Sequence, residues 1–301
     1  MSHFTVLVCV ADENGSLNPR QLESQVVELM APFQENNMED CPQDYLEFIS
    51  VQEDLEEDYA NEDDDTKKNY PSLEEYAEKY NGYSCEDGEY GYWTNPNAKW
   101  DWYQIGGRWK GMFPVKTEDE TMLGEPGVFG DPPEETFKNR ADVTRIKNLD
   151  VDAIAKESIE AAERYWAKWV ALKENKPLKD AQPGDNFFVT MRAHSLGLMD
   201  VKDSISEEEE SRSKLREDSR YDVYSDITKS EFMERFISYF NPIQCYAALD
   251  ENGWHAPGEV GFFGTSSDSP DEKIEFSNSF YQRFIKNKNP NDWLVVVDCH
   301  T

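Results

Sequence analysis

The chain has 301 residues, of which 38% are hydrophobic and 13% aromatic, so it is long enough and apolar enough to bury a core. Its 62 acidic and 30 basic residues give a formal net charge of −32, and the sequence contains no basic patch. This charge argues against direct binding to nucleic acid or to an anionic membrane, and it favours a protein partner with a basic surface.

The cysteines and the longest apolar runs indicate the cellular compartment of the protein. Five widely separated cysteines without a CxxC pair are typical of a reduced, cytosolic chain. No stretch approaches the roughly 18 apolar residues of a membrane span, and the N-terminal apolar run fits a buried strand better than a signal peptide. We therefore expect neither export nor membrane insertion.

The first third of the chain predicts a strand, a helix and an acidic insertion. Residues 4–10 are β-branched and apolar, as in a strand buried on both faces, and apolar spacing over 21–30 predicts a helix. Residues 39–65 contain thirteen acidic residues and no Lys or Arg. We favour a solvated or partly ordered surface insertion over 39–66, with a dedicated binding arm as the alternative. A short helix is expected over 72–80.

The middle of the chain alternates between irregular and helical patterns. Residues 90–113 have no helical period, and their Asn-Pro-Asn and Gly-Gly pairs indicate tight loops beside short strands. Residues 114–148 are interpreted as irregular. Apolar residues from Ile154 to Val170 form one stripe, which predicts a helix over 151–173. Residues 203–225 are highly charged, with an exposed helix expected over 203–220.

The last third predicts the elements that complete a sheet. A second amphipathic helix is expected over 228–240, followed by a β-hairpin that turns at 250–253. A helix is expected over 269–287 and a buried strand over 293–297. Together these elements predict one α+β domain over 1–301. Its mixed, largely antiparallel sheet contains the N- and C-terminal strands and is covered by amphipathic helices.

Five segments together resemble a family of proteins encoded by tailed bacteriophages and prophages. They are MSHFTVLV at the start, LMAPFQEN at 29–36, NPNAKWDWYQIGGRW at 95–109, GWHAPGEVGFFG at 253–264 and LVVVDCHT at the end. Relatives tend to end in Asp-Cys-His-Ile, whereas this chain ends in Thr301. The resemblance implies a phage gene product that acts in the cytoplasm of the infected bacterium, and it implies no established reaction.

The segment around 100–109 is the first candidate for a ligand site. It contains Trp100, Asp101, Trp102, Tyr103, Gly106, Gly107, Arg108 and Trp109. Glycines allow close backbone approach, aromatic faces stack on a planar ligand, and an arginine can bind phosphate or carboxylate. The alternative is that the aromatic residues are core and that Arg108 pairs with Asp101. The glycine pair is not a phosphate loop, because the P-loop and GxGxxG spacings are absent.

The end of the chain is the second candidate, for acid–base or metal chemistry. Strand alternation places Asp298 and His300 on one face and Cys299 on the other. His255 and Glu259 are candidates for completing a metal site, although an Asp-x-His pair more often only forms hydrogen bonds. Cys299 is a weak candidate nucleophile, because a buried strand cysteine is usually inert. No cofactor is implied.

The acidic run is the third candidate, as a surface that binds a partner. Its residues are Glu56, Glu57, Asp58, Asp63, Asp64 and Asp65. They lack the glycine and spaced glutamate of an EF-hand loop. Carboxylates on such a surface can imitate nucleic-acid phosphates and occupy the basic channel of another protein, although solubility alone also accounts for acidity.

The leading hypothesis is a phage accessory protein that works by binding a host or defence protein through its acidic surface. The first alternative is a protein that binds or processes a nucleotide or another small ligand in a pocket built from residues 100–109 with Asp298 and His300. The second is a virion or assembly component. The sequence leaves the oligomeric state open.

Overall fold

The computed structural model describes residues 3–117, 119–173, 228–230, 232–233, 243–259, 267 and 269–301. The chain divides into two compact units. The first comprises residues 1–148, 245–269 and 288–301, and the second comprises 149–244 and 270–287. The expected charged helix at 203–220 and most of the expected helix at 228–240 lie outside the described residues. The single-domain organisation stays a prediction.

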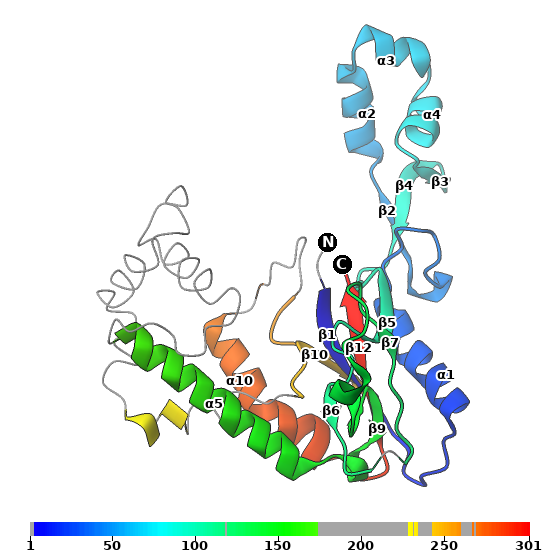
Figure 1. Cartoon of the computed structure of the whole chain (residues 1–301). Coiled ribbons are helices and arrows are strands. Elements are labelled where there is room, and N and C mark those ends of the chain that lie inside the picture. The colour runs from blue at the N-terminus through cyan, green and yellow to red at the C-terminus, as the bar shows by residue number, and fades with distance from the viewer. Residues whose placement is uncertain are drawn as a thin grey trace. The chain divides into compact units, whose positions relative to one another are not determined.

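A mixed, largely antiparallel sheet forms the centre of the first unit (Figure 1). Its strand order is β11-β10-β1-β12-β5-β7, with β9 also paired to β12. The strands are β1 (His3–Val10), β5 (Trp102–Gly107), β7 (Glu125–Pro126), β9 (Val143–Arg145), β10 (Ala247–Asp250), β11 (Gly253–His255) and β12 (Trp293–His300). Strand β1 lies between β12, which is antiparallel to it, and β10, which is parallel. The predicted α+β class and the shared sheet of the terminal strands are confirmed.

One face of this sheet is apolar because alternate residues of β1 and β12 are apolar. Val6 pairs with Val297 and Val8 with Val295, and all four side chains are fully buried. Helix α1 (Pro19–Met30) contributes Leu22, Val26 and Met30 to the same core. The helix begins with a capping box between Asn18 and Gln21, and its first residue is Pro19, whose missing N–H costs nothing there.

Residues 47–94 form a separately cored part of the first unit, which we call the acidic lobe. Its sheet has the order β2-β4-β3, from β2 (Glu47–Ser50), β3 (Ser84–Glu86) and β4 (Glu89–Thr94). The lobe also contains α2 (Gln52–Asn61), α3 (Asp64–Asn69), α4 (Leu73–Glu75) and a π-helical turn (Tyr76–Tyr80). Leu55, Tyr76 and Ala77 form its core, and further tyrosines pack around them.

The acidic run, expected as a solvated or partly ordered surface insertion, contains α2 and the start of α3. Glu53 and Asp54 lie in the first turn of α2, and Asp64 and Asp65 lie in the first turn of α3. Carboxylates at these positions stabilise a helix through its dipole. The tyrosines that cover Leu55 come largely from residues after the run, so the run alone does not reveal the core.

Residues 113–148 contain short ordered elements where an irregular segment was expected. Strands β6 (Phe113–Pro114) and β8 (Arg140–Ala141) pair, and 3-10 turns cover Glu134–Phe137 and Ile146–Asn148.

Arg145 is almost fully buried, contacts Asp12 at 2.7 Å and lies 4.2 Å from the centre of the Trp293 ring. This buried cation is neutralised and enclosed, so its role is structural. Further 3-10 turns occupy Ala31–Phe33 and Gln43–Tyr45.

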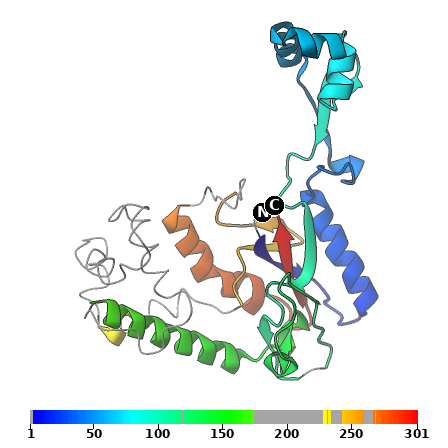
Figure 2. The ribbon, with the colours of Figure 1, turned by 45° about the horizontal axis from the view of Figure 1, so that its top comes forward.

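The second unit contains α5 (Val151–Lys173), α10 (Pro270–Tyr281) and a π-helical turn (Gln282–Lys286) (Figure 2). Ile154, Ala161 and Ala162 of α5 are buried, whereas Ile159, expected in the apolar stripe, is 46% exposed. Phe276, Phe280 and Phe284 pack edge-on or tilted against one another. Within the described part of the chain, no helix is long and apolar enough to cross a membrane.

Candidate functional site

Two histidine–aspartate pairs lie side by side on the face of the main sheet opposite α1. His3 Nδ1 lies 2.7 Å from Asp298 Oδ1, and His300 Nδ1 lies 2.7 Å from Asp101 Oδ1. The strand register places His3 opposite His300 and His300 opposite Trp102, so all three side chains share one face. We call His3, Asp101, Trp102, Asp298 and His300 the histidine–aspartate cluster.

The three rings of this cluster are in contact. His3 and His300 meet edge to face with their ring centroids 5.1 Å apart, and Trp102 stacks on His300 at 5.2 Å and 15°. The side chains of His3 and Asp298 are 5% and 0% exposed, whereas Trp102 is 40% exposed. The cluster is thus a buried set of titratable groups with one aromatic residue at the surface.

The carboxylates fix which nitrogen of each ring carries a proton. An ionised carboxylate only accepts hydrogen bonds, so each Nδ1 must donate. The second nitrogen, Nε2, is then available as a base or a metal ligand, as in other carboxylate–histidine pairs. Among the residues that the structure describes, His300 Nε2 has no hydrogen-bond partner although it is buried. An unsatisfied buried polar atom costs about 1–3 kcal/mol.

Asp298 also holds the turn that follows β5. Its Oδ2 accepts a 2.9 Å hydrogen bond from the backbone N–H of Arg108. Gly107 has φ of +58°, and a Cβ there would lie 2.7 Å from Asp298 Cγ. The glycine pair is therefore explained by close packing on buried carboxylates, because a Cβ on Gly106 would similarly lie 2.6 Å from Asp142 Oδ2.

Asp142 is a buried carboxylate that organises two loops. It accepts hydrogen bonds from the backbone N–H groups of Gly111 at 2.6 Å, Met112 at 3.4 Å and Gly124 at 2.8 Å. Burial raises the pKa of Asp142 above its ordinary value, and these three donors only partly offset that effect. Because its oxygens are occupied by backbone donors, Asp142 supports the site and is not its reactive group.

Residues 100–109 do not gather around one ligand pocket. Trp100 is buried in the core on the α1 face, where its Nε1 donates to Met30 O and its ring meets Tyr103 edge-on at 4.9 Å. Trp102 points to the opposite face, because side chains alternate along a strand. Arg108 is exposed, and Asp101 pairs with His300 where a partnership with Arg108 was the alternative. Trp109 follows in a turn in which its N–H donates to Gly106 O.

The four weak metal candidates do not form a common ligand set. His255 lies 3.0 Å from Asp250, and Glu259 contacts Lys99, whereas Asp298 and His300 belong to the two pairs of the cluster. No group of three or more His, Cys, Asp or Glu side chains in the described ranges could hold a metal ion.

Hydrogen bonds from Lys288, His255 and the Asn252 N–H outweigh burial and lower the pKa of Asp250 to about 2.

Cys299 lies on the α1 face, away from Asp298 and His300, as alternation predicts. The thiol is fully buried, and burial raises its pKa well above the ordinary value. Because the thiolate is the nucleophilic form, this cysteine is inert.

The acidic candidates all lie on the acidic lobe and are exposed. Glu56, Glu57 and Asp58 are on α2, and Asp64 and Asp65 begin α3. Asp63 has a structural role in addition, because its side chain caps α3 by accepting from Thr66 N at 2.8 Å.

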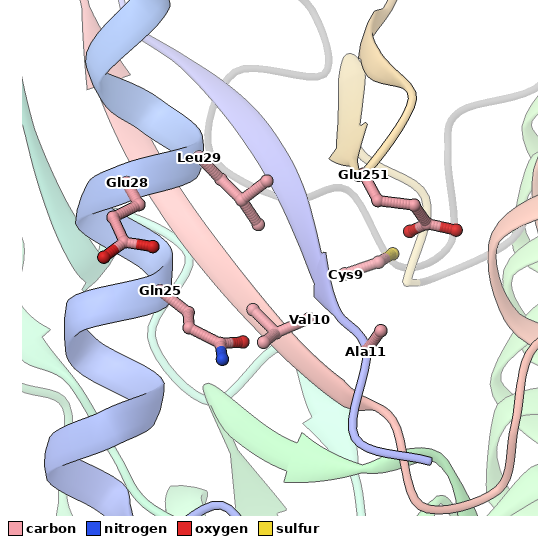
Figure 3. A pocket seen from close by; sticks show the side chains of 7 residues that line it. All are labelled: Cys9, Val10, Ala11, Gln25, Glu28, Leu29 and Glu251. Atoms are coloured by element: carbon pink, nitrogen blue, oxygen red, sulfur yellow. The ribbon is translucent and has the colours of Figure 1, made fainter.

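A small pocket lies between α1 and the end of β1, and sequence analysis gave no sign of it. It encloses about 210 Å³. Figure 3 shows Gln25, Glu28 and Leu29 on α1, with Cys9 and Glu251 on the other side of β1. Burial raises the pKa of the Cys9 thiol. Glu251 in its wall is paired with Lys288, and burial disfavours the reactive thiolate of Cys9, so this pocket is a weaker candidate than the histidine–aspartate cluster.

His3 and Asp101 are the cluster members whose partners the sequence did not reveal. The terminal strands were expected to share a sheet, and an antiparallel register between them would have placed His3 against the end of the chain. Residues from the start, from 95–109 and from the end of the chain meet in this cluster.

Comparison with known proteins gives no relative. No protein-family model matches the chain, and neither a curated protein nor a solved structure matches it. The histidine–aspartate cluster and the acidic lobe are therefore interpreted from their own chemistry.

Proposed function

We propose that this protein is a phage-encoded accessory protein that binds a host or defence protein with a basic surface, in the cytoplasm of the infected bacterium. The acidic lobe is the observation that carries the proposal. Residues 47–94 include 16 acidic and three basic residues, a net charge of −13 out of −32 for the chain. The lobe has a core of its own, so these charges are displayed by folded structure.

Most of the lobe's carboxylates are not neutralised within it. Glu75 pairs with Lys79 at 2.5 Å, and Glu62 accepts from the Tyr76 hydroxyl at 2.7 Å. Glu57, Asp58, Asp64 and Asp65 are exposed on α2 and α3. Like charges held together in this way repel one another, and a basic partner would relieve the repulsion.

Electrostatic binding of this kind has a recognisable signature. Complementary charge raises the association rate at low ionic strength, and salt screens it over a Debye length of about 8 Å at physiological concentration. A partner whose basic groove normally holds nucleic acid would accept carboxylates in place of phosphates. Duplex DNA should then compete with this protein for the partner.

The test neutralises four lobe carboxylates that make no cap or core contact. We would immobilise the wild-type protein and a variant with Glu57→Gln, Asp58→Asn, Asp64→Asn and Asp65→Asn, and pass over each a lysate of the bacterial host. A bound protein should be retained by the wild type only. It should elute as salt is raised, and, if it is a nucleic-acid-binding protein, also when duplex DNA is added.

The matched control changes the same net charge elsewhere. Glu13→Gln, Glu23→Gln, Glu134→Gln and Glu135→Gln are exposed substitutions outside the lobe that also remove four negative charges. This variant should retain the partner. Equal loss in both variants would show that total charge, and not the lobe, attracts the partner, and retention by both would contradict the proposal.

A further inference from the structure

The histidine–aspartate cluster has a chemistry that the acidic lobe does not use. We propose that His3 and His300 form an acid–base site that hydrolyses a phosphate ester of a nucleotide, with His300 as the general base. This activity goes beyond the binding function, because the cluster lies on the main sheet and shares no residue with the lobe.

The first step rests on the fixed orientation of the two rings. Asp101 holds His300 Nδ1 and Asp298 holds His3 Nδ1, both at 2.7 Å. A neutral imidazole held in this way presents a lone pair on Nε2, and a protonated one presents an Nε2 proton. His300 Nε2 is buried and has no hydrogen-bond partner in the described part of the chain, so it is assigned the role of base.

The second step rests on the spacing of the rings. Their centroids are 5.1 Å apart, so one imidazole can face the attacking oxygen and the other the leaving oxygen of a single phosphorus. His255 is the contrasting case, because its partner Asp250 is also bound by Lys288. Only the described pair His3 and His300 combines two oriented rings in contact.

The third step concerns the substrate. Trp102 stacks on His300 and is 40% exposed, which makes it a platform on which a nucleobase can stack beside the imidazoles. Arg108 is exposed, and Asp298 fixes its backbone next to the cluster. Two imidazoles and a guanidinium suit one phosphate group.

The reaction is balanced by one water molecule. His300 Nε2 takes a proton from water while the water oxygen forms a bond to phosphorus. The bond from phosphorus to the leaving oxygen breaks, and His3, protonated on Nε2, gives its proton to that oxygen. Proton exchange with solvent restores both rings. Asp101 and Asp298 act as positioning residues for the two imidazoles.

The test measures hydrolysis of two defined phosphodiesters, bis(4-nitrophenyl) phosphate and the dinucleotide ApA. The full-length wild-type chain should release 4-nitrophenol and adenosine products with a bell-shaped pH profile. His300→Gln and His3→Gln should each lower kcat by about 100-fold or more. His300→Gln should also remove the acid limb of the profile, because that limb reports protonation of the base. Asp101→Asn should shift that limb while retaining part of the rate.

Two controls separate this activity from folding and from the lobe. His255→Gln changes a histidine that is also paired with an aspartate but lies outside the cluster, and it should hydrolyse both substrates at the wild-type rate. The four-site lobe variant should do so too. If the cluster variants fail to fold, imidazole NMR of the wild type with added AMP replaces them, and His3 and His300 resonances should shift.

Absence of hydrolysis together with unshifted His3 and His300 resonances would overturn the proposal. So would an activity that survives unchanged in His300→Gln, since another group would then be responsible. A water molecule held permanently on His300 Nε2 and not displaced by AMP would assign the cluster a structural role instead.

Discussion

At Gly107 the backbone and a buried carboxylate occupy the space that any side chain would need. Gly107→Ala would place a methyl group 2.7 Å from Asp298 Cγ on a residue with φ of +58°. We expect the free energy of unfolding to fall by about 2–4 kcal/mol, from the left-handed backbone and the steric overlap together. Chemical denaturation measures it.

Gly130→Ala is the matched control for this change. Gly130 has φ of +76°, but a Cβ there would meet no atom within 4 Å, so only the backbone cost of about 1 kcal/mol is expected. An equal decrease in the free energy of unfolding of the two variants would show that steric overlap with Asp298 does not contribute to the cost.

Asp250 is the residue whose ionisation links stability to acid pH. Its folded-state pKa is about 2 against an ordinary value of 3.8, so its contribution is present above about pH 4 and disappears as pH falls toward 2. Asp250→Asn should therefore be less stable than the wild type at neutral pH, and the gap should narrow across this window. Urea denaturation at each pH measures the gap.

An exposed aspartate provides the comparison for Asp250. Asp44→Asn lies on the surface and should follow the wild-type curve throughout. A gap between Asp250→Asn and the wild type that stays constant from pH 4 to pH 2 would contradict the role assigned to the Lys288 and His255 contacts.

At the residue scale, the sequence pattern brings together two of the five members of the cluster. Alternation along one strand is enough to place Asp298 and His300 on one face with Cys299 on the other. Their partners depend on the register between β12 and its neighbours, and His3 is nearly 300 residues from His300 in the chain. This register cannot be predicted from local sequence patterns.

Among the elements, the acidic lobe gives the clearest prediction. Leu55 is 3% exposed and lies in a core made only by residues of the lobe. Leu55→Ala should cost about 2–5 kcal/mol and unfold the lobe locally. Hydrogen exchange followed by NMR should show loss of amide protection confined to residues 47–94.

The control for this local unfolding is a leucine of the main sheet. Leu294→Ala removes a fully buried side chain of β12, and protection should then fall throughout the strands of the first unit. Loss of protection in β1 and β12 of the Leu55 variant would show that the lobe does not unfold separately.

Helices and hairpins with strong local signals were predictable, including the helical turns expected over 72–80 behind the Ser72 cap, whereas the core of the lobe was not. Capping by Asn18 and periodic apolar residues mark α1, and the turn at 250–253 marks the β10–β11 hairpin. Repulsion between the carboxylates of the acidic run led us to expect a solvated or partly ordered insertion there. The tyrosines that decide the outcome are spread from Tyr59 to Tyr90 and have no single period.

For the whole molecule, a net charge of −32 predicts that salt stabilises the fold. Repulsion between like charges is stronger in the compact state, and added ions screen it. The free energy of unfolding in urea should rise as sodium chloride is added. The four-site lobe variant should respond less steeply, and a decrease with salt in the wild type would contradict this account.

The arrangement of the strands in the sheet is the part of the fold that was predicted least completely from the sequence. It gave the α+β class and the shared sheet of the terminal strands. It did not give the parallel pairing of β1 with β10 or the division into two units. Both features depend on contacts between distant segments, which no local pattern records.

The position of β1 has a consequence for synthesis of the protein. Its two neighbours, β10 and β12, begin at Ala247 and Trp293, so the first strand leaves the ribosome long before either partner exists. At about 5–20 residues per second, that delay is on the order of 10 to 60 seconds. An apolar strand left unpaired for so long is a target for chaperones and for aggregation, and slower translation should lower the yield of native protein.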